Sequence, residues 1–196
     1  MVVLGVAGAL VVPPLLAGGL PYRARFADGW DVGDTQGGQA RVDRGAYVLS
    51  AGSGWRMWKS APVSSGDTVV VKARARVEAG AGEFGVWCRG DTGTGDRYEF
   101  SVGAGGVVTI AKRRSGKPDT MLYGPARAKG DTGAITARCG QAGGGVTLAL
   151  WLGGDKVAEA VDGDSPYGPG AVGVHVAPQG EQQMRVRFDS FEAAAG

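Results

Sequence analysis

The stretch Thr68-Val-Val-Val-Lys-Ala-Arg-Ala-Arg-Val77 decides the fold class of this chain. From Val71 to Val77, every second residue is apolar and the residues between are lysine or arginine. This two-residue period is that of a β-strand with one buried and one solvated face. The β-branched valines favour the same structure.

Eight further runs of this kind follow, separated by Gly-Asp, Gly-Gly-Asp and Asp-Gly-Asp clusters that are typical of hairpins and loops. They are Glu83–Arg89, Arg97–Val102, Val107–Lys112, Ala134–Cys139, Val146–Leu152, Lys156–Val161, Ala171–Val176 and Met184–Phe191. No window after Leu20 shows a sustained 3.6-residue apolar period. We therefore predict an all-β domain of two packed antiparallel sheets rather than a closed barrel.

The composition agrees with this fold class and excludes several others. The chain has 37 glycines in 196 residues without a fixed period of three, which excludes a collagen-like fibre. Hydrophobic residues make up 43 %, enough for a core, so a wholly disordered chain is excluded as well. The net charge of +2 comes from interspersed basic and acidic residues and indicates no nucleic-acid partner.

The first residues differ in character from the rest. Residues 2–20 are uncharged and approach the ~20 apolar residues that cross a bilayer. We predict a membrane anchor or export signal over 1–20 and one β-sandwich domain over 21–196, at the cell membrane with an extracytoplasmic domain, or secreted. Arginines follow the run but none precedes it, so its orientation is open. The alternatives are a buried strand pair broken at Pro13-Pro14 and a fragment of a longer membrane protein.

Two cysteines lie on predicted strands. Alternation puts Cys88 on the same face as Phe84 and Val86, and Cys139 on the same face as Ile135 and other apolar residues. Both side chains therefore point inward, as a buried disulfide requires. We predict a Cys88–Cys139 bridge in an oxidising compartment. The alternative is two buried free thiols.

The opposite faces of these strands supply candidate binding residues. Trp87 and Arg89 lie opposite Cys88, Arg138 lies opposite Cys139, and Trp151 lies on the side of its strand away from the leucines. If these strands share a sheet, its outer surface carries two tryptophans among arginines. Such a surface suits a sugar ring or an extended peptide. The alternative is that a loop or a neighbouring strand covers the tryptophans.

Two other features have simpler interpretations. In Trp55-Arg-Met-Trp58, alternation places Trp58 opposite Trp55, so we expect one tryptophan to anchor the core and Trp58 to be exposed. His175 lies on a strand among apolar neighbours. We expect it to be structural or on the surface rather than a ligand.

Several stretches, taken in order, resemble bacterial extracytoplasmic members of the concanavalin A-like lectin/glucanase superfamily, and the set is also similar to laminin-G-like modules. They are Phe26-Ala-Asp-Gly-Trp30, Gly45-Ala-Tyr47, Phe84-Gly-Val-Trp-Cys-Arg89, Arg97-Tyr-Glu-Phe100, Gly106-Val-Val-Thr-Ile110, Leu148-Ala-Leu-Trp-Leu-Gly-Gly154, Gly170-Ala-Val-Gly-Val174 and Phe188-Asp-Ser-Phe191. The resemblance implies a jelly-roll sandwich. It does not fix the function, because this superfold hosts lectins, glycosidases and adhesion or sensor modules.

Catalytic residues of the superfamily are not found. Its glucanases carry Glu-x-Asp-x-x-Glu on one strand, and no glutamate of this chain is followed two residues later by aspartate. An inverting pair of carboxyl groups from distant strands stays open. We identify no catalytic residue, and an enzyme is the third hypothesis.

We predict no metal site and no cofactor, with calcium as the alternative. The plant-lectin type of calcium site uses asparagine, which this sequence lacks. Calcium would be ligated by carboxylates and loop carbonyls, and the candidate carboxylates are those of Asp28, Asp31 and Asp34, or of Asp162 and Asp164.

These observations favour a membrane-anchored or exported, non-catalytic binding module. The predicted partner is a glycan bound on an outer sheet face through Trp87, Arg89, Arg138 and Trp151. The alternative is a structural or sensory module that binds a protein of the cell envelope, and the second alternative is a glycoside hydrolase-like enzyme.

Overall fold

A computed structural model describes residues 19–196 of the chain. The predicted membrane anchor or export signal, residues 1–20, lies almost wholly outside the described residues. Within residues 19–196, no helix is long and apolar enough to span a membrane. The rest of the chain forms two antiparallel sheets and one short 3₁₀ turn, η1 (Ala104–Gly106).

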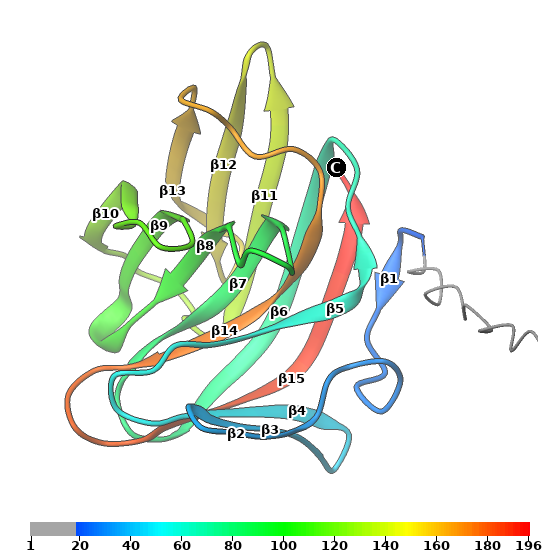
Figure 1. The fold of residues 1–196 in the computed structure, drawn as a ribbon. Coiled ribbons are helices and arrows are strands. Elements are labelled where there is room, and N and C mark those ends of the chain that lie inside the picture. Colours follow the sequence, from blue (N-terminus) through cyan, green and yellow to red (C-terminus); the bar gives the residue numbers. More distant parts are fainter. Residues whose placement is uncertain (1–18) are drawn as a thin grey trace, which may run out of the picture.

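The larger sheet has nine strands (Figure 1). Eight of them follow the spatial order β13 (Asp155–Asp162), β12 (Gly145–Leu152), β11 (Ala134–Ala142), β6 (Thr68–Ala79), β15 (Met184–Ala195), β4 (Ala46–Ala51), β3 (Gly38–Asp43) and β2 (Gly33–Thr35), and β1 (Tyr22–Arg23) pairs with β15. β6, which contains the alternating stretch Val71–Val77, is an interior strand of this sheet. It pairs with β11 on one side and with β15 on the other.

The smaller sheet has six strands. Their order is β10 (Thr120–Arg127), β9 (Val107–Arg113), β8 (Arg97–Val102), β7 (Gly82–Gly90), β14 (Ala171–Pro178) and β5 (Met57–Ser64). In Figure 1, β5 and β14 lie across β6 and β15, and contacts join β7 to β6 and β14 to β15. The two sheets therefore form the predicted all-β sandwich, with the core between them.

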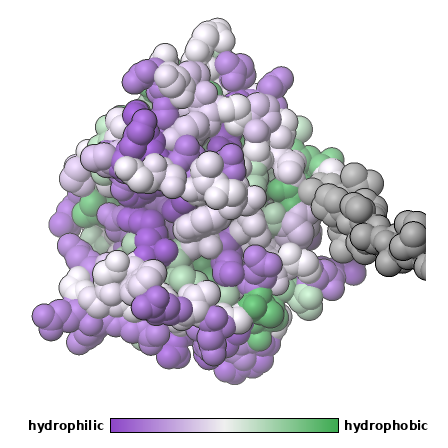
Figure 2. Space-filling view, in the orientation of Figure 1, coloured by the Kyte–Doolittle hydropathy of each residue, from purple (hydrophilic) through white to green (hydrophobic). Residues whose placement is uncertain are grey.

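The core is formed by the alternate residues that the strand pattern assigned to the inner faces. Val71 of β6 and Val86 of β7 are fully buried, as is Phe100 of β8. The view in Figure 2 shows a largely hydrophilic exterior on which the apolar patches are small and separated. The alternation in the sequence thus sorts side chains between the core and the solvated outer faces of the two sheets.

The predicted disulfide is confirmed. Cys88 of β7 and Cys139 of β11 are bridged, with 51 residues of separation and a Cα–Cα distance of 6.6 Å. Because β7 and β11 belong to different sheets, the bridge fastens one sheet to the other through the core.

A buried ion pair holds the loop between β13 and β14 against the sandwich. Lys112 Nζ lies 2.7 Å from the Asp162 carboxylate, and the Tyr98 hydroxyl donates to the same carboxylate at 2.6 Å. The Tyr167 amide in turn donates to the Tyr98 hydroxyl at 2.9 Å. Asp162 is therefore committed to this cluster rather than held ready for calcium. Among residues 19–196, no three His, Cys, Asp or Glu side chains are grouped to hold a metal ion.

Candidate functional site

The outer face of the six-stranded sheet carries a buried glutamate. Trp87 of β7 pairs with Glu99 of β8, so the two side chains stand side by side on the face away from the core. Glu99 is 0 % exposed. A carboxylate on the outer face of a sheet ordinarily stays in water, so its burial requires specific partners.

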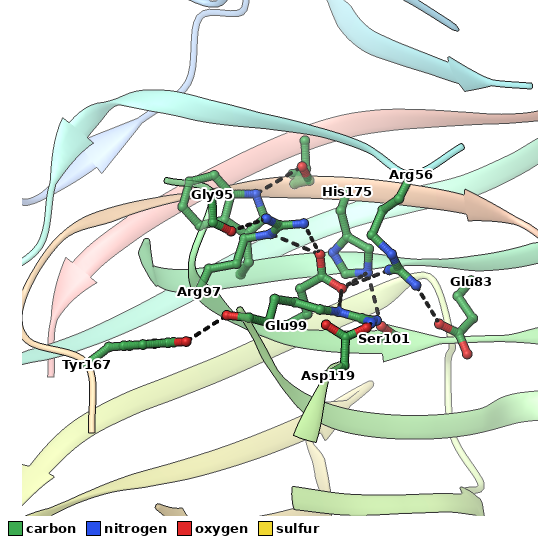
Figure 3. A network of polar contacts seen from close by, with 12 residues as sticks. Arg56, Glu83, Gly95, Arg97, Glu99, Ser101, Asp119, Tyr167 and His175 are labelled. Atoms are coloured by element: carbon green, nitrogen blue, oxygen red, sulfur yellow. Dashed lines mark hydrogen bonds and ion pairs between the residues drawn. The ribbon is translucent and has the colours of Figure 1, made fainter. Parts of the chain in front are cut away.

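Three arginines supply those partners, and Figure 3 labels two of them, Arg56 and Arg97, beside Glu99. Arg97 donates to Glu99 Oε1 through Nη2 at 2.6 Å, while Arg113 Nε and Arg56 Nη1 donate to Oε2 at 2.6 and 2.8 Å. The arginines come from β8, from β9 and from the residue before β5. The cluster therefore joins both halves of the sheet over its outer face.

The protonation state of Glu99 follows from this arrangement. Burial alone would raise the pKa of its carboxyl, but the interactions with the surrounding guanidinium groups outweigh burial and hold that pKa well below its usual range. Glu99 is thus an anion at neutral pH, and both of its oxygens accept hydrogen bonds from guanidinium groups. It lacks the raised pKa that a general acid of a glycosidase needs.

Two tryptophans, Trp87 and Trp58, cover the part of this face that contains Gly173. Trp87 lies against Gly173, where an added Cβ would come within 2.6 Å of the indole. The Trp58 ring meets Trp87 edge-on with centroids 5.9 Å apart, and the Arg97 guanidinium lies 4.7 Å from the centroid of Trp58. Trp58 is half-buried. It is therefore a positioned aromatic surface, stacked on one side and partly open.

An open pocket of about 240 Å³ lies next to this aromatic surface. Residues of the β7–β8 and β9–β10 loops line part of it, and Asp96 Oδ1 joins those loops by accepting from the Ser115 amide at 2.5 Å. We call it the arginine pocket. Its side-chain lining is dominated by charged groups and one tryptophan, namely Arg56, Trp58, Arg97, Arg113, Arg114 and Asp119.

Ser101, His175 and Glu99 lie together beneath the arginines but do not form a catalytic triad. Ser101 Oγ is 3.0 Å from His175 Nε2, and Glu99 Oε2 is 4.0 Å from that same nitrogen. A triad needs the acid on the opposite ring nitrogen, which would orient the imidazole. Nδ1 is buried without a hydrogen-bond partner among residues 19–196. His175, which we expected to be structural or on the surface, is buried in the sheet.

The buried imidazole predicts a pH dependence of stability. Burial and the nearby guanidinium groups lower the pKa of His175 to about 3. The unfolded residue takes up a proton near pH 6.5 while the folded one does not, so the free energy of unfolding falls as the pH drops below about 6.5. The expected contribution is about 1 kcal/mol per pH unit between about pH 6 and 5.

Urea unfolding of the protein and of His175→Gln at several pH values tests this expectation. The variant should show a shallower decrease by that amount, because the remaining groups titrate equally in both proteins. Equal slopes would contradict the assignment of a neutral buried imidazole.

The sequence-predicted binding residues Trp87 and Arg89 are both buried. Trp87 is on the predicted face but only 1 % exposed, and its Nε1 donates to the Val174 carbonyl at 3.0 Å. Arg89 is 2 % exposed and donates to the Tyr167 carbonyl at 2.7 Å and to the Asp67 carbonyl. Trp87 is covered by Trp58, which belongs to β5, two strands away in the same sheet.

Arg138 and Trp151 lie elsewhere. Both stand on the outer face of the nine-stranded sheet, where Trp151 pairs with Thr136 and Arg138 pairs with Ala149. Arg138 is exposed and Trp151 half-buried. The four predicted residues therefore do not share one surface, because β7 and β12 belong to different sheets.

A larger hollow of about 980 Å³ lies at another edge of the sandwich, lined mainly by glycine and alanine. Its Arg74 and Arg76 are ion-paired with Asp131 and Asp189. The tryptophan held against a guanidinium group and the arginines around the buried Glu99 lie at the arginine pocket instead.

No protein-family model matches the sequence, and no curated protein matches it. Solved structures do match. The carbohydrate-binding module CBM66 from Bacillus subtilis aligns with a TM-score of 0.52 and 17 % identity, over 84 % of this chain and 95 % of that chain.

Two glucanases match as well. A prokaryotic β-1,3-1,4-glucanase (lichenase) from a mouse hindgut metagenome has a TM-score of 0.60 and 12 % identity, over 90 % of this chain and 99 % of its own. A glycoside hydrolase family 16 endo-glucanase from Bacteroides ovatus has a TM-score of 0.54 and 10 % identity, over 88 % and 99 %. Identities this low establish the fold alone. The domain has the concanavalin A-like jelly-roll sandwich fold, as its resemblance implies.

Proposed function

We propose that this chain is a non-catalytic carbohydrate-binding module whose site is the arginine pocket. The observation that carries the proposal is the juxtaposition of Trp58, a positioned and partly open indole, with several guanidinium groups. An aromatic face stacks on the apolar face of a sugar ring, and planar donors bond its hydroxyls. The fold shared with a carbohydrate-binding module and with glucanases supports a glycan as the ligand.

The ion pairs of the two carboxylates at the pocket, Glu99 and Asp119, favour binding of a glycan over its hydrolysis. Glycoside hydrolysis needs two carboxyl groups about 5–10 Å apart, one of them protonated. Glu99 is an anion enclosed by arginines, and Asp119, the carboxylate in the pocket lining, is ion-paired with Arg113. Neither is free to donate a proton or attack a sugar.

We place the module outside the cytoplasm, because the Cys88–Cys139 bridge needs an oxidising compartment to persist. The hydrophobic residues 1–20 support export or membrane attachment. Together these features favour a ligand in the cell envelope or outside the cell.

A matched pair of tryptophan variants tests the site. We expect Trp58→Ala to weaken binding to a glycan identified on a polysaccharide panel by roughly tenfold, since the loss of one stacking surface costs about 1–2 kcal/mol. Trp151→Ala removes a half-buried tryptophan from the opposite sheet and should leave the affinity unchanged. Isothermal titration calorimetry measures both, and circular dichroism checks folding.

If Trp151→Ala weakened binding and Trp58→Ala did not, the site would lie on the nine-stranded sheet with Arg138 and Trp151. Failure of the natural protein to bind any glycan of the panel would reject the carbohydrate-binding function and favour a protein partner.

A further inference from the structure

We infer that the arginine pocket takes a sugar that carries a negatively charged substituent, a carboxylate or a sulfate. The inference rests on the proposed function and adds the chemical class of the ligand. Three features support it: the arginines that line the pocket, the N–H groups of Arg114 that lack strong partners, and the Asp119 carboxylate paired with Arg113.

Most of the charged side chains that line the pocket are arginines. Four arginines face it against one carboxylate, that of Asp119. Glu99 beneath the arginines and Glu83, which lies 3.5 Å from Arg56, offset two of the positive charges. Four arginines against these three carboxylates leave a surplus of one positive charge, and Arg114 is the one arginine of the lining without an ion pair among residues 19–196. Guanidinium groups concentrated in a partly enclosed site favour an anion, which lowers their mutual repulsion.

Donors are left for such an anion. Arg114 lines the pocket, and its Nε is buried without a hydrogen-bond partner among residues 19–196. Its Nη2 has only a long bond of 3.3 Å to Thr120 Oγ1. That is the one side-chain hydrogen bond of Arg114 among these residues, so its other Nη N–H groups are left for a ligand, and a bond from a guanidinium to an anion is stronger than one between neutral groups.

The Asp119 carboxylate shows how an anion fits this place. It is 42 % exposed at the mouth of the pocket and binds Arg113 Nη1. Guanidinium groups bind carboxylates with two parallel hydrogen bonds. A ligand carboxylate or sulfate therefore competes with a side chain that already occupies the position, and displacing Asp119 releases it to solvent.

The size of the pocket limits what enters. Its 240 Å³ is below the ~300–1,000 Å³ typical of sites that enclose a drug-sized ligand. We therefore expect one charged sugar residue, rather than a chain segment, to be enclosed, with the Trp58 ring beside it.

Calorimetry with three sets of oligosaccharides of equal length tests the inference: glucuronate-containing, sulfated and neutral. We expect at least one charged set to bind about tenfold more tightly than the neutral set, as for hydrogen bonds to a charged group. The charged interaction should weaken on raising the salt from about 0.1 to 1 M, where the screening length falls to about 3 Å. The two charged sets distinguish carboxylate from sulfate.

Two variants with matched controls locate the effect. Arg114→Gln should weaken charged-ligand binding roughly tenfold, whereas Lys117→Gln, the same charge change in the same loop outside the pocket lining, should not. Asp119→Asn should strengthen it severalfold by removing the competing carboxylate, and Asp131→Asn, paired with Arg74 in the other hollow, should have no effect.

The outcomes separate the two proposals. Preference for neutral glycans, or salt-independent binding unaltered by Arg114→Gln, would overturn the anionic ligand while leaving the glycan-binding function standing. Binding of no set, charged or neutral, would overturn both.

Discussion

Glu99→Gln is expected to lower the free energy of unfolding by roughly 3–5 kcal/mol, the cost of removing one partner from a buried ion cluster. The substitution keeps the size of the side chain but removes the only charge at the centre of Arg56, Arg97 and Arg113. It also replaces an acceptor oxygen with an amide group that can only donate. Urea unfolding at neutral pH measures the loss.

Two further variants keep this prediction decisive. Glu159→Gln removes the same charge from an exposed pair with Lys156 and should cost less than about 1 kcal/mol. Adding Arg97→Gln to Glu99→Gln should recover part of the stability, because fewer uncompensated cations remain. A loss for Glu99→Gln as small as that of Glu159→Gln would show that the arginines do not depend on Glu99.

The same cluster shows what strand alternation can predict. The predicted strand Arg97–Val102 is β8 with the same bounds, and its residues Arg97, Glu99 and Ser101 point away from the core as the pattern requires. Alternation is a local property of the chain, so it assigns faces correctly. It does not tell what lies on top of a face.

Long-range pairing explains why none of the residues that line the arginine pocket is among the predicted binding residues. Alternation places Trp87 on the outer face, but Trp58 of β5 covers it across β14, where Gly173 has no side chain to separate the two rings. Likewise, Trp151 was grouped with Trp87 although β11 pairs with β6 in the other sheet. The local sequence does not determine which strands become neighbours. Alternation along single strands therefore cannot predict which side chains share a surface.

Some strands were missed for a local reason. All six residues of β4 are buried and Ser50 is the one clearly polar residue among them, so the strand shows no apolar–polar alternation. β10 contains Gly124-Pro125, a pair that signals a turn rather than a strand. Conversely, the arginine pocket depends on the β7–β8 and β9–β10 loops, whose positions follow from tertiary packing.

Removal of the disulfide is the second large effect that we expect. The double variant Cys88→Ala/Cys139→Ala should lose roughly 4 kcal/mol of stability, because the unfolded chain regains the freedom of a loop closed over a separation of 51 residues. Urea unfolding with and without a reducing agent measures it. The reduced natural protein should unfold near the midpoint of the variant, and the variant should not respond to the reducing agent.

Glycan affinity should change little in that variant at temperatures where it stays folded. Cys88 points into the core, whereas its neighbour Trp87 and the paired Glu99 stand on the opposite face of the sheet, under the arginine pocket. The bridge therefore stabilises the junction of the two sheets without contributing a group to the pocket. A parallel loss of affinity and stability would contradict this separation, and free thiols in the native protein would contradict the bridge itself.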